Sequence, residues 1–162
     1  MSAVDYFMKI DDITGESQDA KHKGSIEIES WSWGESQMGT HSDGSGGGAG
    51  RVQMQDFHFV MKINKASPKL ILACATGEHF KKAVLICRKA GKEQQEFLKI
   101  EMDDLLVSSY HTGGSGHTDI IPTDQISLNY GKIHFEYREQ KQDGSLGGAI
   151  RTGYDLRARK NT

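Results

Sequence analysis

Short runs in which hydrophobic and polar residues alternate make up most of the chain. Alternation with a period of two places apolar side chains on one face of a strand, so these runs predict β structure. The turn of a hairpin is predicted at residues 89–92. We find no βαβ rhythm and no internal repeat, and the pattern predicts one domain across residues 1–162. The predicted strands are residues 4–10, 25–33, 51–63, 82–89, 94–102, 105–111, 124–138 and 153–157.

One helix, at about residues 67–76, interrupts the strands. Ser67 is expected at the N-cap, where its hydroxyl accepts a hydrogen bond from a free backbone N–H. Pro68 loses no hydrogen bond at the first helical position, and Gly77 can adopt the left-handed conformation that ends a helix. The residues predicted to form its packing side are Leu70, Leu72, Ala73 and Cys74.

Two predicted strands change the face that carries their apolar residues. In residues 124–138 the apolar side chains lie at even positions up to Tyr130 and at odd positions from Ile133. One extra residue at or near Gly131 would return them to one face, so we predict a β-bulge there. Residues 25–33 show the same switch. Two switches favour a small antiparallel β-barrel, or a curved two-sheet sandwich, with one flanking helix.

The segment between residues 25–33 and 51–63 is rich in glycine. Six of the twelve residues from 39 to 50 are glycine, and Gly44, Gly46 and Ala49 have the spacing of a dinucleotide-binding loop. Such a loop follows a buried parallel strand and opens a helix, whereas these glycines lead into an alternating, strand-like run. No Gly-Lys-Ser/Thr sequence follows either. The pattern therefore predicts an extended flexible loop, not a nucleotide site.

Charge and composition restrict the partners. The formal net charge is −2, and the densest basic segment is the tail at residues 157–160, which argues against nucleic acid binding. We find no ordinary export signal and no apolar run that could span a bilayer, so we expect no membrane insertion. The chain is expected to be made in the cytoplasm and to leave, if it leaves, by a signal-independent route. Cys74 and Cys87 are expected to be reduced core residues, with a disulfide or a metal pair as the alternatives.

Catalytic and metal chemistry find no support in the sequence. Seven histidines are scattered, and His111 and His117 flank a glycine-rich segment with no carboxylate or thiolate at metal spacing. The adjacent pairs at 11–12 and 103–104 are poor acid–base pairs, because neighbouring side chains on a strand point to opposite faces. No nucleophile motif is present. We therefore expect neither an enzyme nor a cofactor.

Several longer segments are specific when taken in order. They are AVDYFMKIDDITGES, SWSWGESQ before the glycine-rich loop, VQMQDFHFVMKINKASPKLILACATGEHF, AVLICRKAGKEQQEFLKIEMDDLLVSSYHTGGSG and ISLNYGKIHFEYREQ. Together they cover nearly the whole chain and resemble the haemolysin-coregulated protein (Hcp) family of the bacterial type VI secretion system.

The resemblance implies a small β-barrel that assembles into a hexameric ring. Rings of this family stack into a tube, which a contractile sheath propels out of the cell together with tip proteins. The ring lumen binds and chaperones small effector proteins, and the protein is itself secreted. Two alternatives stay open: a free hexameric effector carrier that does not form the main tube, and an unrelated small β-barrel hydrolase.

The resemblance also implies roles for particular residues. If Trp31 to Trp33 are extended, the two indoles share one face and Ser32 points to the other, which in the family is the inner wall of the ring. A bulge near residues 29–30 would rotate this assignment, and a solvent-facing serine with no role is the alternative. The extended loop is expected to reach a neighbouring ring and comprises Gly39, Thr40, His41, Ser42, Asp43, Gly44, Ser45, Gly46, Gly47, Gly48, Ala49, Gly50 and Arg51.

Residues 51–63 carry apolar groups on both faces. One face is predicted to fill the barrel and the other to contact a neighbouring subunit, since a ring of identical chains needs two complementary surfaces. A strand buried under the helix would show a similar pattern. The candidates for the subunit interface are Val52, Met54, His58 and Val60.

Overall fold

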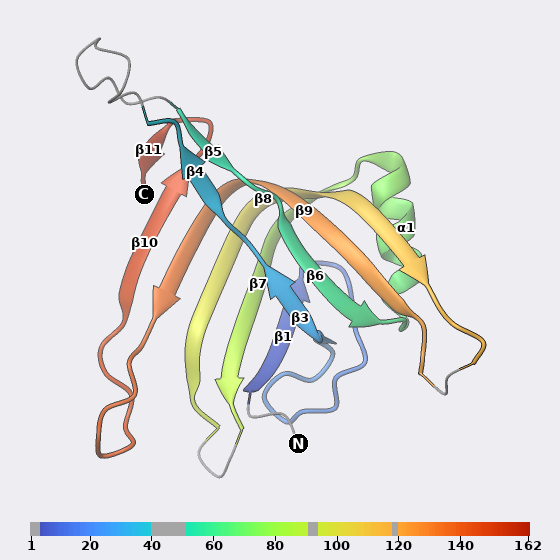
Figure 1. Cartoon of the computed structure of the whole chain (residues 1–162), viewed down its shortest axis with the longest axis horizontal. Coiled ribbons are helices and arrows are strands. Elements are labelled where there is room, and N and C mark those ends of the chain that lie inside the picture. The colour runs from blue at the N-terminus through green and yellow to red at the C-terminus, as the bar shows by residue number, and fades with distance from the viewer. Residues whose placement is uncertain (1–3, 40–50, 91–93, 118–119) are drawn as a thin grey trace.

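The computed structural model describes residues 4–39, 51–90, 94–117 and 120–162, and strands dominate it (Figure 1). The one helix in these ranges is α1, Ser67–Thr76. The strands are β1 Val4–Ile10, β2 Ile26–Glu27, β3 Ser30–Ser32, β4 Glu35–Gln37, β5 Val52–Met54, β6 Phe57–Lys62, β7 His79–Lys89, β8 Glu96–Gly113, β9 Thr123–Tyr137, β10 Ile150–Asp155 and β11 Lys160–Asn161.

The main sheet is antiparallel and curves into a barrel. Its strand order is β11-β10-β9-β8-β7-β1-β2, while β6 pairs with the first half of β9 and β3 pairs with β6. The chain between β2 and β3 joins the two ends of this sheet. Ile28 N–H donates to the Tyr6 carbonyl at 3.1 Å, and Glu29 N–H donates to the Val60 carbonyl at 2.8 Å. The predicted small antiparallel β-barrel with one flanking helix is confirmed.

The apolar switch in residues 25–33 comes from a change of partner strand. β2 pairs with β1, whereas β3 pairs with β6. Ile26 faces the core before the change, and Trp31 stacks on Phe57 after it, at 5.9 Å between ring centroids. A strand that crosses from one partner to another changes its buried face without inserting a residue into either ladder.

The bulge predicted at Gly131 is wrong, although the switch of faces is real. Met102 pairs with Ile133 and Leu105 pairs with Tyr130, so β8 and β9 each place two residues between their inward-facing positions and the register does not shift. Both strands therefore change their inward-facing side at the same level of the sheet. There Asp104, opposite Gly131, takes a left-handed φ of 52°. The pattern of one strand alone cannot distinguish such a simultaneous change in two paired strands from a bulge.

The ladder does shift register at two other positions along β8. Opposite β9 the shift lies between Val107 and Ser109, and opposite β7 it lies between Cys87 and Arg88. Residues 94–102 and 105–111, predicted as two strands, are therefore one long bulged strand. Gly91 and Lys92 of the predicted hairpin turn lie outside the described residues.

Helix α1 covers one side of the barrel, next to β8 and β9 (Figure 1). Leu70 and Ala73 are fully buried, but Leu72 is 60% exposed, so its predicted packing role is wrong. At 100° per residue, Leu72 lies too far around the helix from Leu70 to share its face. Gly77 ends the helix at a φ of 68°, as predicted.

The N-terminus of α1 differs from the prediction, because Ala66 is the N-cap and Ser67 is already helical. The Ser67 hydroxyl points into the barrel and donates to a carboxylate oxygen of Asp124 at 2.6 Å. It also accepts the Asn64 backbone N–H at 3.0 Å, while the Asn64 side-chain oxygen accepts the Ala66 N–H. The serine thus joins the helix to β9 instead of capping it.

Both cysteines are free thiols, and this confirms the reduced reading. Cys87 is buried in the core, and burial raises the pKa of its thiol to about 12. A thiol of such high pKa has almost no thiolate at neutral pH and is a poor nucleophile. Cys74 is half-buried on α1.

Candidate functional site

A polar wall on one face of the barrel carries the candidate site. Four strands lie side by side in the order β3-β6-β9-β8, and they surround a hollow of about 430 Å³. Alternation explains the wall: Phe57, Phe59 and Met61 of β6 point into the core, so the residues between them point outward. The residues that line the hollow, with side-chain or backbone atoms, are Ser30, Trp31, Ser32, His58, Phe59, Val60, Ser109, His111, Gln125, Ile126 and Ser127.

Uncharged hydrogen-bonding groups define the chemistry of the wall. Hydroxyl, imidazole and amide groups line the described hollow, and none of its lining residues is Asp, Glu, Lys or Arg. One imidazole and one hydroxyl are paired, because His58 Nδ1 lies 2.6 Å from Ser127 Oγ. Such groups donate and accept hydrogen bonds without the desolvation cost of a fixed charge, so the surface suits many protein partners.

The His58–Ser127 pair lacks, within the described chain, the third group of a catalytic triad. An activated serine needs a base that a third group orients. Among the described residues, no carboxylate forms a hydrogen bond with the His58 ring, whose recorded partner is Ser127. The arrangement fits a binding surface.

Ser32 lies in this wall and points away from the core. It pairs with His58 across β3 and β6, and it is exposed. The flanking indoles point the other way: Trp31 stacks on Phe57, and Trp33 Nε1–H donates to the Tyr130 hydroxyl at 2.5 Å. The predicted orientation of the three residues is confirmed, while the place of Ser32 in a ring lumen stays a prediction.

The four candidate interface residues fall in two places. His58 and Val60 belong to the polar wall. Val52 and Met54 belong to β5, which pairs with β4 in a separate two-stranded arm. Residues 51–63 look continuous in the sequence, but the strand breaks at Gln55 and Asp56. The contact of these four residues with a neighbouring subunit stays a prediction.

The arm leaves the barrel beside the wall (Figure 1). Glu35 pairs with Met54 and Gln37 with Val52, so the two legs run antiparallel. The glycine-rich loop joins these legs, and its end residues Gly39 and Arg51 are exposed. The predicted loop residues between them, Thr40, His41, Ser42, Asp43, Gly44, Ser45, Gly46, Gly47, Gly48, Ala49 and Gly50, lie outside the described residues.

Both outer strands of the wall have a free edge within the described chain. β3 pairs with β6 alone. On the other side, β7 pairs with β8 only as far as Leu106, so residues 107–113 of β8 have β9 as their one strand partner. Unpaired backbone N–H and C=O groups at such edges are templates for another strand.

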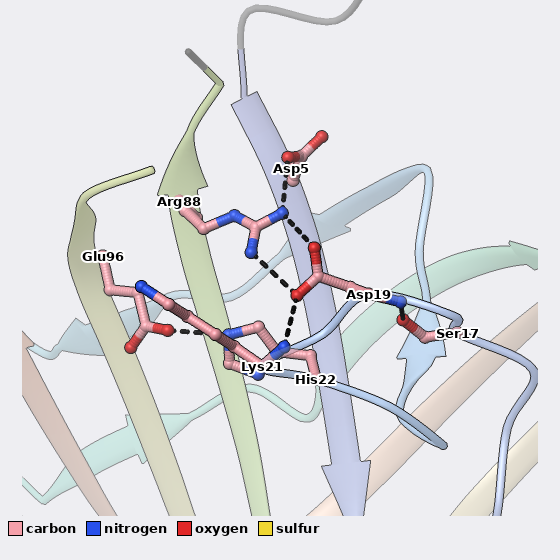
Figure 2. Close-up of polar contacts among 7 residues, drawn as sticks. All are labelled: Asp5, Ser17, Asp19, Lys21, His22, Arg88 and Glu96. Atoms are coloured by element: carbon pink, nitrogen blue, oxygen red, sulfur yellow. Dashed lines mark hydrogen bonds and ion pairs between the residues drawn. The ribbon is translucent and has the colours of Figure 1, made fainter. Parts of the chain in front are cut away.

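A second polar cluster fastens the loop between β1 and β2 to the barrel (Figure 2). Arg88, 3% exposed, forms ion pairs with Asp19 at 2.7 Å and with Asp5 at 3.1 Å. The guanidinium group lies 4.8 Å from the centre of the Phe7 ring, and His22 stacks on that ring. The hydrogen bonds from Arg88 hold the pKa of Asp19 well below its usual range. No local pattern in the sequence indicates this cluster, because its members lie far apart in the chain.

The described residues contain no group of three His, Cys, Asp or Glu side chains that could hold a metal ion. Within the same ranges, no helix has the length and apolar character needed to cross a membrane.

Comparisons with known proteins agree with this geometry. Residues 7–137 match a family described as "Type VI secretion system effector, Hcp". Protein hcp1 of Pseudomonas aeruginosa is 45% identical over 157 residues, which cover 96% of each chain. The crystal structure of Hcp1 from Salmonella typhimurium is 38% identical, with a TM-score of 0.84 over 99% of this chain and 100% of that one. A structure described as a type six secretion system protein is 30% identical, with a TM-score of 0.94 over the same shares.

The fold is thus that of a β-barrel component of a secretion machine. The chain belongs to the Hcp family of the type VI secretion system.

Proposed function

We propose that six copies of the chain form a ring whose lumen is lined by the polar wall. The observation that carries the proposal is the wall itself, which is concave, uncharged and bounded by a free strand edge on each side. A closed ring of identical chains needs two different, complementary surfaces. The free edge of β3 in one copy and that of β8 in the next would provide them.

The proposed rings stack into the inner tube of the secretion system, which the contractile sheath propels behind the tip proteins. The arm supports this role, since it projects from the barrel and carries the glycine-rich loop at its end. A loop that becomes ordered only on contact loses conformational entropy, which weakens the contact and lets stacked rings separate again.

The lumen is proposed to bind and chaperone small effector proteins and to carry them when the protein is itself secreted. Neutral hydrogen-bonding groups on the wall fit cargo of varied surface charge. Made in the bacterial cytoplasm, the ring would leave with the tube. A free hexameric carrier is the second candidate, and the stacking role of the arm separates the two.

Shortening the loop by removing residues 44–50 tests this function. We expect the variant to form hexamers like the wild type, because the loop lies beyond the paired legs of the arm, but to form few stacked rings. Light scattering measures the ring, and electron microscopy counts the stacks. A glycine–serine replacement of the same length is the control and should stack normally. Normal stacking and normal effector secretion by the shortened variant would contradict the tube role.

A further inference from the structure

Both legs of the arm attach to the barrel at one side chain, Tyr130 of β9. The Trp33 indole N–H, at the start of the first leg, donates to the Tyr130 hydroxyl oxygen at 2.5 Å. That hydroxyl donates in turn to the backbone carbonyl of Gln55 at 2.8 Å, directly after the second leg. One phenol therefore joins the two ends of the arm to the barrel sheet.

Tyr130 is built into the barrel, since only 5% of it is exposed. Burial raises the pKa of its phenol to about 12, so the hydroxyl stays protonated at physiological pH and both donates and accepts. Among the described residues, Trp33 N–H and the Gln55 carbonyl have no other recorded side-chain partner. Loss of the hydroxyl would take this partner from both groups in a half-buried region, where an unsatisfied polar group costs free energy.

Two further sets of hydrogen bonds lie where the arm meets the barrel. Gln55 N–H donates to the Gly34 carbonyl at 2.9 Å, which holds the legs to each other but not to the barrel. The Asp56 carboxylate accepts hydrogen bonds from Ser108 at 2.6 Å and Asn129 at 2.9 Å, but these contacts are exposed. Water competes for exposed hydrogen bonds, so the half-buried bonds of Tyr130 are the stronger constraint on the direction of the arm.

We infer that Tyr130 is a positioning residue, whose hydroxyl fixes the direction in which the β4–β5 arm leaves the barrel and so aligns the arm with the next ring. This inference rests on the proposed stacking role of the arm. Because Tyr130 is buried, it touches no neighbouring ring and acts through Trp33 and Gln55.

The variant Tyr130→Phe tests the inference by removing the hydroxyl alone. Tyr110→Phe is the matched control, because the Tyr110 hydroxyl is buried beside Ser67 and Asp124 at the start of α1, away from the arm. Hydrogen exchange is measured on assembled rings. We expect amides of β4 and β5 to exchange about tenfold faster in Tyr130→Phe, with barrel amides unchanged. Tyr110→Phe should exchange like the wild type throughout the arm.

Stacking gives the second readout. Tyr130→Phe should form intact hexamers that stack in fewer and shorter tubes, while Tyr110→Phe stacks normally. Arm exchange and stacking at wild-type levels in Tyr130→Phe would overturn the inference. If Tyr130→Phe does not fold, Trp33→Phe removes the other end of the same hydrogen bond and is judged by the same readouts. A third outcome separates the two proposals. If arm exchange is faster in Tyr130→Phe but the variant that lacks residues 44–50 stacks normally, the tube role is contradicted and the effect of Tyr130 on the arm is established.

Discussion

At the scale of single residues, Arg88 shows how a buried charge is kept in a small barrel. Its guanidinium group is almost fully enclosed and would be unstable there alone, but Asp19 and Asp5 neutralise it (Figure 2). The Phe7 ring also covers it. Asp19 belongs to the loop between β1 and β2, so the ion pair holds that loop on the outer face of the barrel.

Replacing Asp19 with Asn should lower the free energy of unfolding at pH 7 by on the order of 2 kcal/mol, because Arg88 keeps only Asp5 as a charged partner. The pKa of Asp19 is lowered in the folded protein, so its ionised form stabilises the fold above about pH 4, and this contribution disappears as pH falls further. The difference between variant and wild type should therefore shrink below pH 4. Urea unfolding between pH 3 and 7 measures it.

Asp12→Asn is the control for this prediction. Asp12 lies in the same loop at a φ of 66°, which Asn tolerates, and it forms no recorded ion pair. Its substitution should change stability little at any pH. A constant difference between Asp19→Asn and wild type across the whole pH range would contradict the ion-pair account.

At the scale of elements, α1 depends on a left-handed residue at its end. Gly77 has a φ of 68°, and a Cβ added there would meet no atom within 4 Å. A substitution therefore tests backbone conformation alone. Gly77→Ala should lower the free energy of unfolding by about 1 kcal/mol, because an L side chain is strained at positive φ.

Thermal unfolding measures this effect, and a loss of about 1 kcal/mol corresponds to roughly 2–4 °C in a chain of this size. Gly148→Ala is the matched control, since its added Cβ also has open space and its φ is not positive. Equal midpoints for Gly77→Ala and Gly148→Ala would show that the cap contributes nothing.

Elements whose signal lies within a few neighbouring residues could be predicted from the sequence. The Ser-Pro start and Gly77 end of α1 gave the bounds of the helix, and alternation gave the bounds of β1. Features that arise between elements could not be predicted this way. The simultaneous change of face in β8 and β9 looked like a bulge at Gly131, and the break at Gln55 lay inside a run that was predicted as one strand.

The same limit applies to the candidate site. Ser32 was predicted to point away from the core, because its flanking tryptophans fix the orientation of the strand. Its neighbours Ser127 and His111 join it only through the pairing of β3, β6, β9 and β8, which no local pattern reports. His58 was grouped with Val52 by period two, although the two residues lie in different sheets.

At the scale of the whole molecule, the barrel has three surfaces with different properties. One is the uncharged wall around the hollow. The other two are the projecting arm and the flank covered by α1 (Figure 1). The proposed ring would account for the first surface, with its two free strand edges, and the proposed stacking of rings would account for the second. Under this proposal the assembly, not the single chain, is the functional unit.

Imaging the purified native particle by cryo-electron microscopy tests this claim most directly. The account predicts a six-membered ring of 17.9 kDa chains, about 107 kDa in total, with β3, β6, β9 and β8 facing a central channel. Ser32 and His58 should line that channel, with β3 of each copy beside β8 of the next. A monomer at all concentrations, or a ring with Ser32 and His58 on its outer surface, would contradict the account.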